Sequence, residues 1–117
     1  MNTFICYEKC STCRKAEKWL NDHQIEYQKR LIDKEKPAAE EIEKWARISG
    51  RPLNKFFNTS GRLYREQGLS KHLLFMSDEE ILETLASDGM MVKRPIFLTD
   101  DTVLVGFKEE EWSEKLQ

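Results

Sequence analysis

The sequence has no long hydrophobic run and almost no imbalance of charge. Its 117 residues contain 19 Lys and Arg against 21 Asp and Glu, which gives a net charge of −2. The longest apolar stretches, such as residues 3–7, span only a few residues, whereas a membrane helix needs about 20. The chain does not open with a basic stretch followed by an apolar one, so we expect no secretory signal and no membrane association. Because there is no basic excess, direct nucleic-acid binding is not expected either.

Cysteines are few and confined to one end of the chain. All three, Cys6, Cys10 and Cys13, lie within the first 13 residues. A secreted disulfide scaffold instead carries an even number of cysteines spread along its sequence. The pattern therefore indicates a reducing cytoplasm and a local thiol chemistry.

The length and composition indicate one folded domain. Apolar residues make up 39% of the chain and charged residues 34%, which is typical of globular proteins. The chain is shorter than the roughly 150 residues expected per domain, and it contains no internal repeat or linker. We expect a single domain over residues 1–117.

The first 31 residues favour a β-α-β unit. Residues 3–7 are apolar on both alternating faces and predict a buried central strand. Cys13, Ala16 and Leu20 recur at helical spacing, and residues 25–28 alternate as a second strand does. The two strands are expected to be parallel because a helix connects them.

In the rest of the chain the periodicity of the apolar residues changes twice. Residues 32–88 favour short helices, with Pro37 in the first turn of one and a capping box at residues 77–80 opening another. Residues 96–98 and 103–105 predict a β-hairpin, and a helix follows from Lys108. The order β-α-β, helical block, β-β-α predicts an α/β fold with a four-stranded mixed sheet and helices on its faces.

Cys10 and Cys13 carry the clearest chemical signal. They are separated by two residues and lie between the first strand and the first helix, where free N–H groups and the positive helix end favour a thiolate. One cysteine attacks a disulfide and the other, one helical turn away, resolves the mixed disulfide. Half of a zinc site and two inert cysteines are the alternatives, although two further zinc ligands are missing. Cys6, on the predicted strand, is expected to be an ordinary core residue.

The sequence resembles the arsenate reductase/Spx family, a thioredoxin-fold group with a helical insertion. The matching segments contain the cysteine pair, a middle Phe-Phe-Asn-Thr-Ser-Gly sequence, an Arg-Pro pair before a strand, and a Gly-to-Trp segment near the end. They cover residues 7–16, 56–61, 93–98 and 105–112. The resemblance implies a thioredoxin-like fold, with the helical insertion at about residues 33–90.

The resemblance also implies the roles of individual residues. Cys10 would be the nucleophile and Cys13 the resolving thiol. Arg94 would bind an oxyanion or stabilise the thiolate beside a cis-Pro95. Further residues are expected to line the substrate pocket; they are Ser11, Thr12, Arg14 and Pro95. We expect no metal and no resident cofactor. The electrons would come from glutathione, bacillithiol, glutaredoxin or thioredoxin.

The family divides by function. Arsenate reductases surround their oxyanion with three arginines, of which Arg94 has a counterpart here, while the other two positions fall near Asn54 and Gly106. Those enzymes usually have a serine where this chain has Cys13. Spx proteins have the cysteine pair and bind the C-terminal domain of the RNA polymerase α subunit, through a glycine that aligns near Pro52.

The sequence favours a cytosolic thiol–disulfide oxidoreductase that acts on a small thiol or protein disulfide, with arsenate as a further substrate to test. The alternative is a Spx-like redox-sensing transcriptional regulator that binds RNA polymerase.

Overall fold

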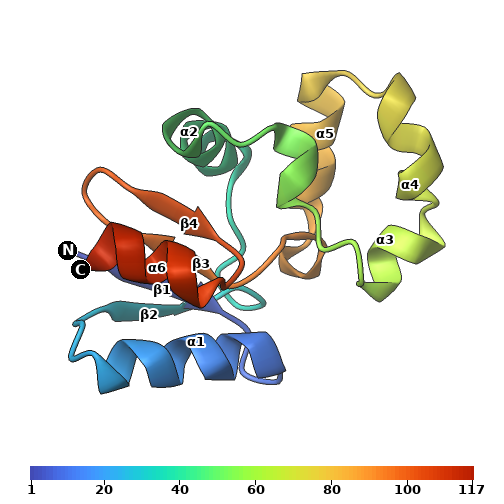
Figure 1. The fold of residues 1–117 in the computed structure, drawn as a ribbon. Helices are drawn as coiled ribbons and strands as arrows, with labels where there is room; N and C mark the ends of the chain where they lie inside the picture. The colour runs from blue at the N-terminus through green and yellow to red at the C-terminus, as the bar shows by residue number, and fades with distance from the viewer. The chain divides into compact units, whose positions relative to one another are not determined.

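The computed structural model describes residues 1–117, which form two compact units. The first unit joins Met1–Leu31 to Arg94–Gln117, and the second is Ile32–Lys93 (Figure 1). None of the helices combines the length and apolar character that crossing a membrane requires. The helical segment predicted for about residues 33–90 falls within the second unit, and the expectation of one domain over the whole chain stays a prediction.

The first unit is built on a four-stranded sheet. β1 (Thr3–Cys6) pairs in parallel with β2 (Gln28–Leu31) and antiparallel with β3 (Ile96–Leu98), which pairs antiparallel with β4 (Val103–Val105). The strand order is β2-β1-β3-β4. The predicted α/β fold and its mixed sheet are therefore confirmed, with the connection from β1 to β2 made by a helix as the parallel pairing requires.

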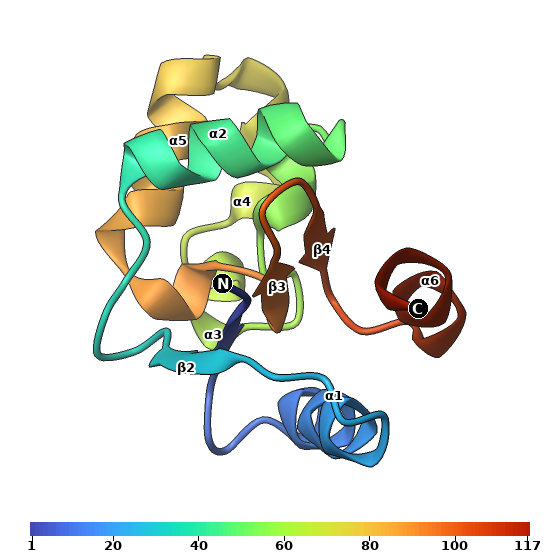
Figure 2. The same cartoon turned by 90° about the vertical axis from the view of Figure 1, so that its left-hand side faces the viewer.

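Two helices pack beside the sheet of the first unit. These are α1 (Ser11–Asp22) and α6 (Glu109–Leu116), which lie near one another in both ribbon views (Figures 1 and 2). One buried cluster joins both helices to alternate residues of the strands; its members include Phe4, Cys6, Cys13, Ala16, Phe97, Leu104 and Trp112. Because Cys13 and Ala16 belong to this core, packing fixes the start of α1, where the cysteine pair lies.

The second strand begins later than predicted. The sequence pattern indicated a strand over residues 25–28, but β2 begins at Gln28. Gln24 has a positive φ of 57°, and the N–H of Ile25 donates to the carbonyl of Leu20 at 3.0 Å. Residues 24 and 25 are therefore part of the turn that leaves α1. Ile25 and Tyr27 alternate because they pack against the core cluster, which periodicity alone does not distinguish from strand pairing.

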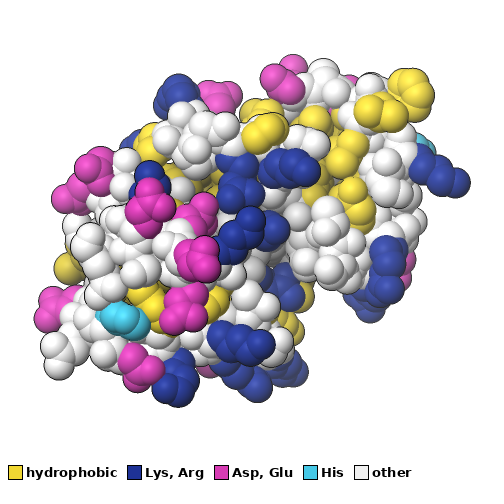
Figure 3. Space-filling model, viewed as in Figure 1, with side chains coloured by type: hydrophobic (Ala, Val, Ile, Leu, Met, Phe, Trp, Pro, Cys, Tyr) yellow, Lys and Arg dark blue, Asp and Glu magenta, His cyan; other side chains and the backbone are white.

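The second unit consists of short helices. They are α2 (Ala39–Ser49), η1 (Leu53–Phe56), α3 (Arg62–Glu66), α4 (Leu69–His72), η2 (Leu73–Phe75), α5 (Asp78–Ser87) and η3 (Gly89–Met91). The predicted capping box is confirmed, since Ser77 and Glu80 exchange hydrogen bonds at the start of α5. Pro37 precedes α2 instead of lying in its first turn, because Ala38 is the N-cap residue. Leu74 and Phe75 are 87% and 85% exposed, and hydrophobic side chains are visible at the surface of this unit in Figure 3.

The indole of Trp112 links α6 to the loop that follows β4. The ring is fully buried and contacts Phe4, Phe97 and Phe107 at centroid distances of 6.5, 5.4 and 4.9 Å. Its Nε1 donates to the carbonyl of Gly106 at 3.0 Å. A buried carbonyl oxygen that loses its donor destabilises the folded state, so this hydrogen bond constrains the loop as well as the helix.

We expect Trp112→Phe to lower the free energy of unfolding by about 2–4 kcal/mol. The smaller ring leaves a cavity, and the Gly106 carbonyl loses its buried donor. Urea unfolding followed by circular dichroism measures the change. Leu74→Ala, at an exposed position, is the control and should stay within about 0.5 kcal/mol of the unsubstituted protein. A Trp112→Phe protein as stable as this control would contradict the account.

Candidate active site

Cys10 is the N-cap residue of α1. Its backbone is extended (φ −98°, ψ 120°), and its Sγ accepts a hydrogen bond from the N–H of Cys13 at 3.4 Å. The N–H of Cys10 itself donates to the carbonyl of Tyr7 at 3.1 Å. These bonds close the turn between β1 and α1 and hold the sulfur over the free N–H groups of the first helical turn, which is a favourable place for an anion.

The surroundings of Cys10 favour its thiolate. Partial burial by itself would raise the pKa of the Cys10 thiol. The Cys13 N–H, the Cys13 thiol and the positive charge of Arg94 outweigh this effect, so that the pKa of Cys10 lies below its ordinary value. Cys10 is also partly exposed. It therefore combines a lowered pKa with the access that an attacking thiol needs.

Cys13 has the opposite character. It is 3% exposed, and its Sγ accepts a hydrogen bond from the N–H of Tyr7 at 3.4 Å. Burial raises the pKa of Cys13 to about 12, although the Tyr7 N–H acts in the other direction, and the neighbouring Cys10 sulfur raises it further. Both cysteines are free thiols in this structure. The pair therefore contains one thiol that ionises readily and one that holds its proton.

Arg94 and Pro95 bring the start of β3 to the cysteines. The peptide bond between them is cis, as the family resemblance implied. The Arg94 guanidinium lies over the ring of Tyr7, with its Cζ 5.0 Å from the ring centroid. Its Nε and Nη1 atoms are buried and have no hydrogen-bond partner. A charged, planar group with free donors is thus held beside the Cys10 thiolate.

The other predicted pocket residues are placed differently. Ser11 and Thr12 are exposed on the first turn of α1, and Pro95 is buried. The Arg14 guanidinium is exposed, and its Nε donates to the carbonyl of Glu8 at 3.2 Å. The structure therefore groups Cys10, Cys13 and Arg94 closely and ties Arg14 to the preceding loop.

Tyr7 is a site residue that the sequence reasoning did not identify. Its ring supports the Arg94 guanidinium, its N–H donates to Cys13, and its carbonyl accepts from Cys10. The available signal was an aromatic residue directly after β1 and three positions before Cys10. The strand pattern explained this residue as core, and only the fold brings Arg94 next to it.

Cys6 has the buried position that the sequence predicted. It is 2% exposed and belongs to the core cluster. Burial raises the pKa of the Cys6 thiol to about 11, although the positive charge of Lys29 partly opposes this. A thiol that is both buried and protonated is a poor nucleophile, so Cys6 is distinct in character from Cys10.

The structure gives a physical reason for the missing arginine near Gly106. Gly106 is buried with a φ of 75°, and its N–H donates to the carbonyl of Pro95 at 2.8 Å. Side chains other than glycine are strained in this left-handed region. An arginine at this position would therefore be strained in the backbone conformation that the loop adopts.

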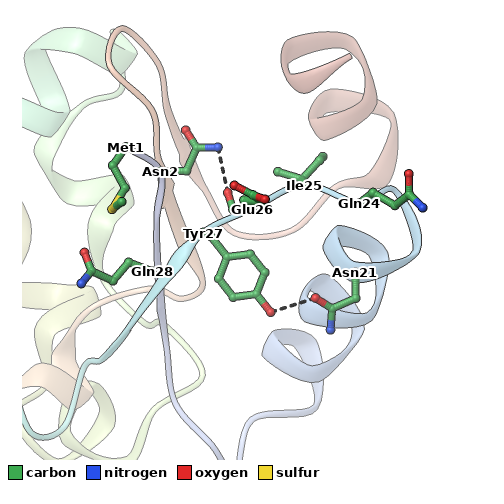
Figure 4. Close-up of a pocket in the computed structure, with 8 residues that line it drawn as sticks. All are labelled: Met1, Asn2, Asn21, Gln24, Ile25, Glu26, Tyr27 and Gln28. Atoms are coloured by element: carbon green, nitrogen blue, oxygen red, sulfur yellow. Dashed lines mark hydrogen bonds between the residues drawn. The ribbon is translucent and has the colours of Figure 1, made fainter.

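A cavity of the first unit lies at the end of α1 that is remote from Cys10. It has a volume of about 1120 Å³ and is lined by residues around the end of α1 and the start of β2, among them Asn21, Gln24 and Tyr27 (Figure 4). Cys10 is at the other end of α1, a 12-residue helix and thus about 18 Å long. This groove is therefore separate from the cysteine site. No three His, Cys, Asp or Glu side chains are grouped so that they could share a metal ion.

Comparison with known proteins gives one family over nearly the whole chain. A model described as the ArsC family matches residues 6–115. The uncharacterized protein YusI of Bacillus subtilis is 49% identical over 112 residues, which cover 96% of this chain and 95% of YusI. Two other curated relatives are named as regulators. The regulatory protein MgsR of B. subtilis is 28% identical (93% and 85% covered), and the global transcriptional regulator Spx 2 of Bacillus cereus is 28% identical (87% and 76% covered).

Solved structures agree with this result. A putative ArsC family related protein from Bacteroides fragilis is 50% identical with a TM-score of 0.94, covering 97% of this chain and 95% of that protein. A possible arsenate reductase from Streptococcus mutans is 42% identical with a TM-score of 0.87, covering 97% and 98%. The thioredoxin-like fold that the resemblance implied is thereby confirmed.

We expect Cys10 to be alkylated by iodoacetamide with an apparent pKa below the ordinary cysteine value of about 8.5. Arg94→Gln should raise this pKa, because a positive charge that stabilises the thiolate is lost, and alkylation at neutral pH should slow. Lys15→Gln removes the same charge from an exposed side chain of α1 and should leave the pKa nearly unchanged. The extent of Cys10 alkylation is measured as a function of pH by mass spectrometry of the cysteine peptides. If Arg94→Gln and Lys15→Gln gave the same pH profile, Arg94 would not be the group that stabilises the Cys10 thiolate.

Proposed function

This chain belongs to the ArsC family, and we propose that it is a thiol–disulfide oxidoreductase that uses Cys10 and Cys13 as its redox pair. The observation that carries the proposal is the difference in exposure and pKa between the two thiols. The Cys10 sulfur is partly exposed and stabilised as a thiolate by the helix N-terminus and Arg94, whereas Cys13 is buried and protonated directly behind it.

The reaction uses two exchange steps. The Cys10 thiolate attacks one sulfur of a substrate disulfide, which forms a mixed disulfide and releases the other sulfur as a thiolate. Cys13 then loses its proton and attacks the Cys10 sulfur, so that the second substrate sulfur leaves and the Cys10–Cys13 disulfide forms. Once Cys10 is bonded to the substrate, its negative charge no longer raises the pKa of Cys13, which favours this second step.

The return to the dithiol needs a thiol donor. We propose glutathione, bacillithiol, glutaredoxin or thioredoxin for this role, and a small thiol or a protein disulfide as the substrate. Pro95 would shape the surface where either docks, beside Ser11, Thr12 and Arg14. A reducing cytoplasm is the proposed location because the cysteine pair must be returned to its thiol form there.

Arsenate is a weaker candidate for the substrate. The possible arsenate reductase from S. mutans supports testing it, but arsenate carries more negative charge than the single guanidinium of Arg94 balances. The positive φ of Gly106 disfavours an arginine at that position. We therefore expect arsenate reduction to be slow compared with disulfide exchange.

The roles of the two cysteines predict opposite effects of two similar substitutions. Cys10→Ser should abolish reduction of a disulfide such as oxidised glutathione, because the attacking sulfur is lost. Cys13→Ser should still attack but should accumulate a mixed disulfide at Cys10, visible as an added mass in the intact protein. Cys6→Ser, which alters a buried thiol, should leave turnover within a few-fold of that of the unsubstituted protein. Full activity in Cys10→Ser would refute the proposed reaction.

A second candidate function is a redox-sensing transcriptional regulator. The regulators MgsR and Spx 2 among the relatives favour it, and the same cysteine pair would act as the sensor. For this function we propose that the chain binds the C-terminal domain of the RNA polymerase α subunit.

The regulator function predicts binding that depends on the redox state. Isothermal titration of the isolated α C-terminal domain against the reduced and the oxidised chain should give at least ten-fold different affinities. Cys10→Ser should lose this difference because it cannot form the disulfide. Absence of binding in both states at micromolar concentrations would remove this candidate and leave the oxidoreductase unaffected.

A further inference from the structure

The Arg94 guanidinium has more hydrogen-bonding capacity than the protein uses. Its Nε and Nη1 are buried without a partner, while the guanidinium lies over the Tyr7 ring and makes a hydrogen bond to Cys10 that lowers the pKa of that thiol. Buried N–H groups are nearly always paired in native proteins, because leaving them unpaired costs free energy. Two such donors beside a reactive sulfur therefore point to a ligand that brings an oxygen atom to Cys10.

We propose that this site reduces hydroperoxides, with the Cys10 thiolate attacking the peroxide and Arg94 donating hydrogen bonds to the peroxide oxygens. The inference rests on the proposed redox function of the Cys10–Cys13 pair and adds a class of substrate to it. Arg94 is then a catalytic residue, because it contacts the reacting oxygens.

A hydroperoxide fits the charge of the site. When the thiolate attacks, one negative charge moves from the sulfur to the departing oxygen, and one guanidinium stabilises one such charge. The reacting sulfur atoms of a disulfide offer no oxygen to the free donors of Arg94. Gly106, whose N–H donates to the carbonyl of Pro95, has no side chain that could supply a second cation for a more highly charged oxyanion.

The two thiols and the hydroperoxide account for all atoms and electrons of the reaction. The Cys10 thiolate forms a bond to the terminal oxygen of ROOH as the O–O bond breaks, which gives the sulfenic acid at Cys10 and, after protonation of the leaving oxygen, ROH. The sulfur is oxidised by two electrons and the peroxide is reduced by two. The Cys13 thiol then attacks the Cys10 sulfur, the disulfide forms, and water leaves. Two molecules of a low-molecular-weight thiol reduce this disulfide and become oxidised to their own disulfide.

The position of Cys13 suits the second of these steps. Its N–H donates to the Cys10 sulfur at 3.4 Å, and the two thiols are close enough to hydrogen-bond to each other. A sulfenic acid that condenses with a neighbouring thiol is protected from irreversible oxidation. Cys10 should therefore survive many turnovers, whereas Cys10 in Cys13→Ser should be converted to the sulfinic acid.

The test compares hydrogen peroxide and tert-butyl hydroperoxide with oxidised glutathione as reactants of the reduced protein. Rates of Cys10 oxidation are measured by quenching and mass spectrometry, at a pH above the Cys10 pKa of each variant so that thiolate fractions match. We expect Arg94→Gln to slow the peroxide reactions about 100-fold, the effect of removing one oxyanion donor, and the glutathione disulfide reaction by less than ten-fold.

Two variants separate hydrogen bonding from charge. Arg94→Lys keeps the positive charge but loses the planar pair of donors, so it should restore the glutathione reaction and leave the peroxide reaction at least ten-fold slow. Lys15→Gln should leave both rates unchanged. Circular dichroism establishes that each variant is folded, and dimedone labelling of Cys13→Ser should detect the sulfenic acid at Cys10.

The outcomes distinguish this inference from the proposed function. Normal exchange with oxidised glutathione, together with peroxide rates that are the same in the unsubstituted protein and in Arg94→Gln, would overturn the peroxide inference alone. Failure of Cys10 to react with either oxidised glutathione or peroxide would overturn both. If peroxide reacts in a way that depends on Arg94 but no disulfide exchange occurs, the peroxide inference stands and the proposed exchange reaction is refuted.

Discussion

The hydrogen bond from the Cys13 N–H to the Cys10 sulfur is the interaction on which the account depends. It exists because Cys10 is the N-cap of α1, and the N-cap exists because Cys13 and Ala16 are packed into the core against β1. A side chain that accepts from the first turn of a helix stabilises the helix, and the N–H groups of that turn stabilise the anionic form of the side chain. The same contact therefore begins α1 and prepares Cys10 for attack.

The two cysteines differ because the environment changes over one helical turn. Cys10 lies where the turn opens, close to the Arg94 charge, and Cys13 lies on the buried face of the same helix. Arg94 reaches Cys10 because the β1–β3 pairing brings the Arg94–Pro95 peptide next to the end of β1, where Tyr7 holds the guanidinium. The sheet therefore joins a nucleophile from one end of the chain to a cation from the other.

Much of the first unit could be predicted from the sequence, because its signals are local. Each of its elements is indicated by residues that are close together in the sequence. The signals are the alternation in residues 3–7, the helical spacing of Cys13, Ala16 and Leu20, and the two apolar stretches of the hairpin. The start of β2 could not be predicted in the same way. Ile25 and Tyr27 alternate like strand residues, yet they pack against the core while the chain is still turning. Tyr7 was missed for a related reason, since its partner Arg94 is distant in sequence and only the fold brings the two together.

The most direct test of the central claim is the reduction potential of the Cys10–Cys13 pair, measured by titration against reduced and oxidised glutathione with mass-spectrometric counting of free thiols. The account predicts one intramolecular disulfide between these two residues, with Cys6 remaining a thiol. Its potential should fall within reach of cytosolic thiols, roughly −220 to −320 mV. A protein that forms no disulfide under oxidising conditions, or that pairs Cys6 in preference to Cys10, would contradict the assignment of Cys10 and Cys13 as a redox pair.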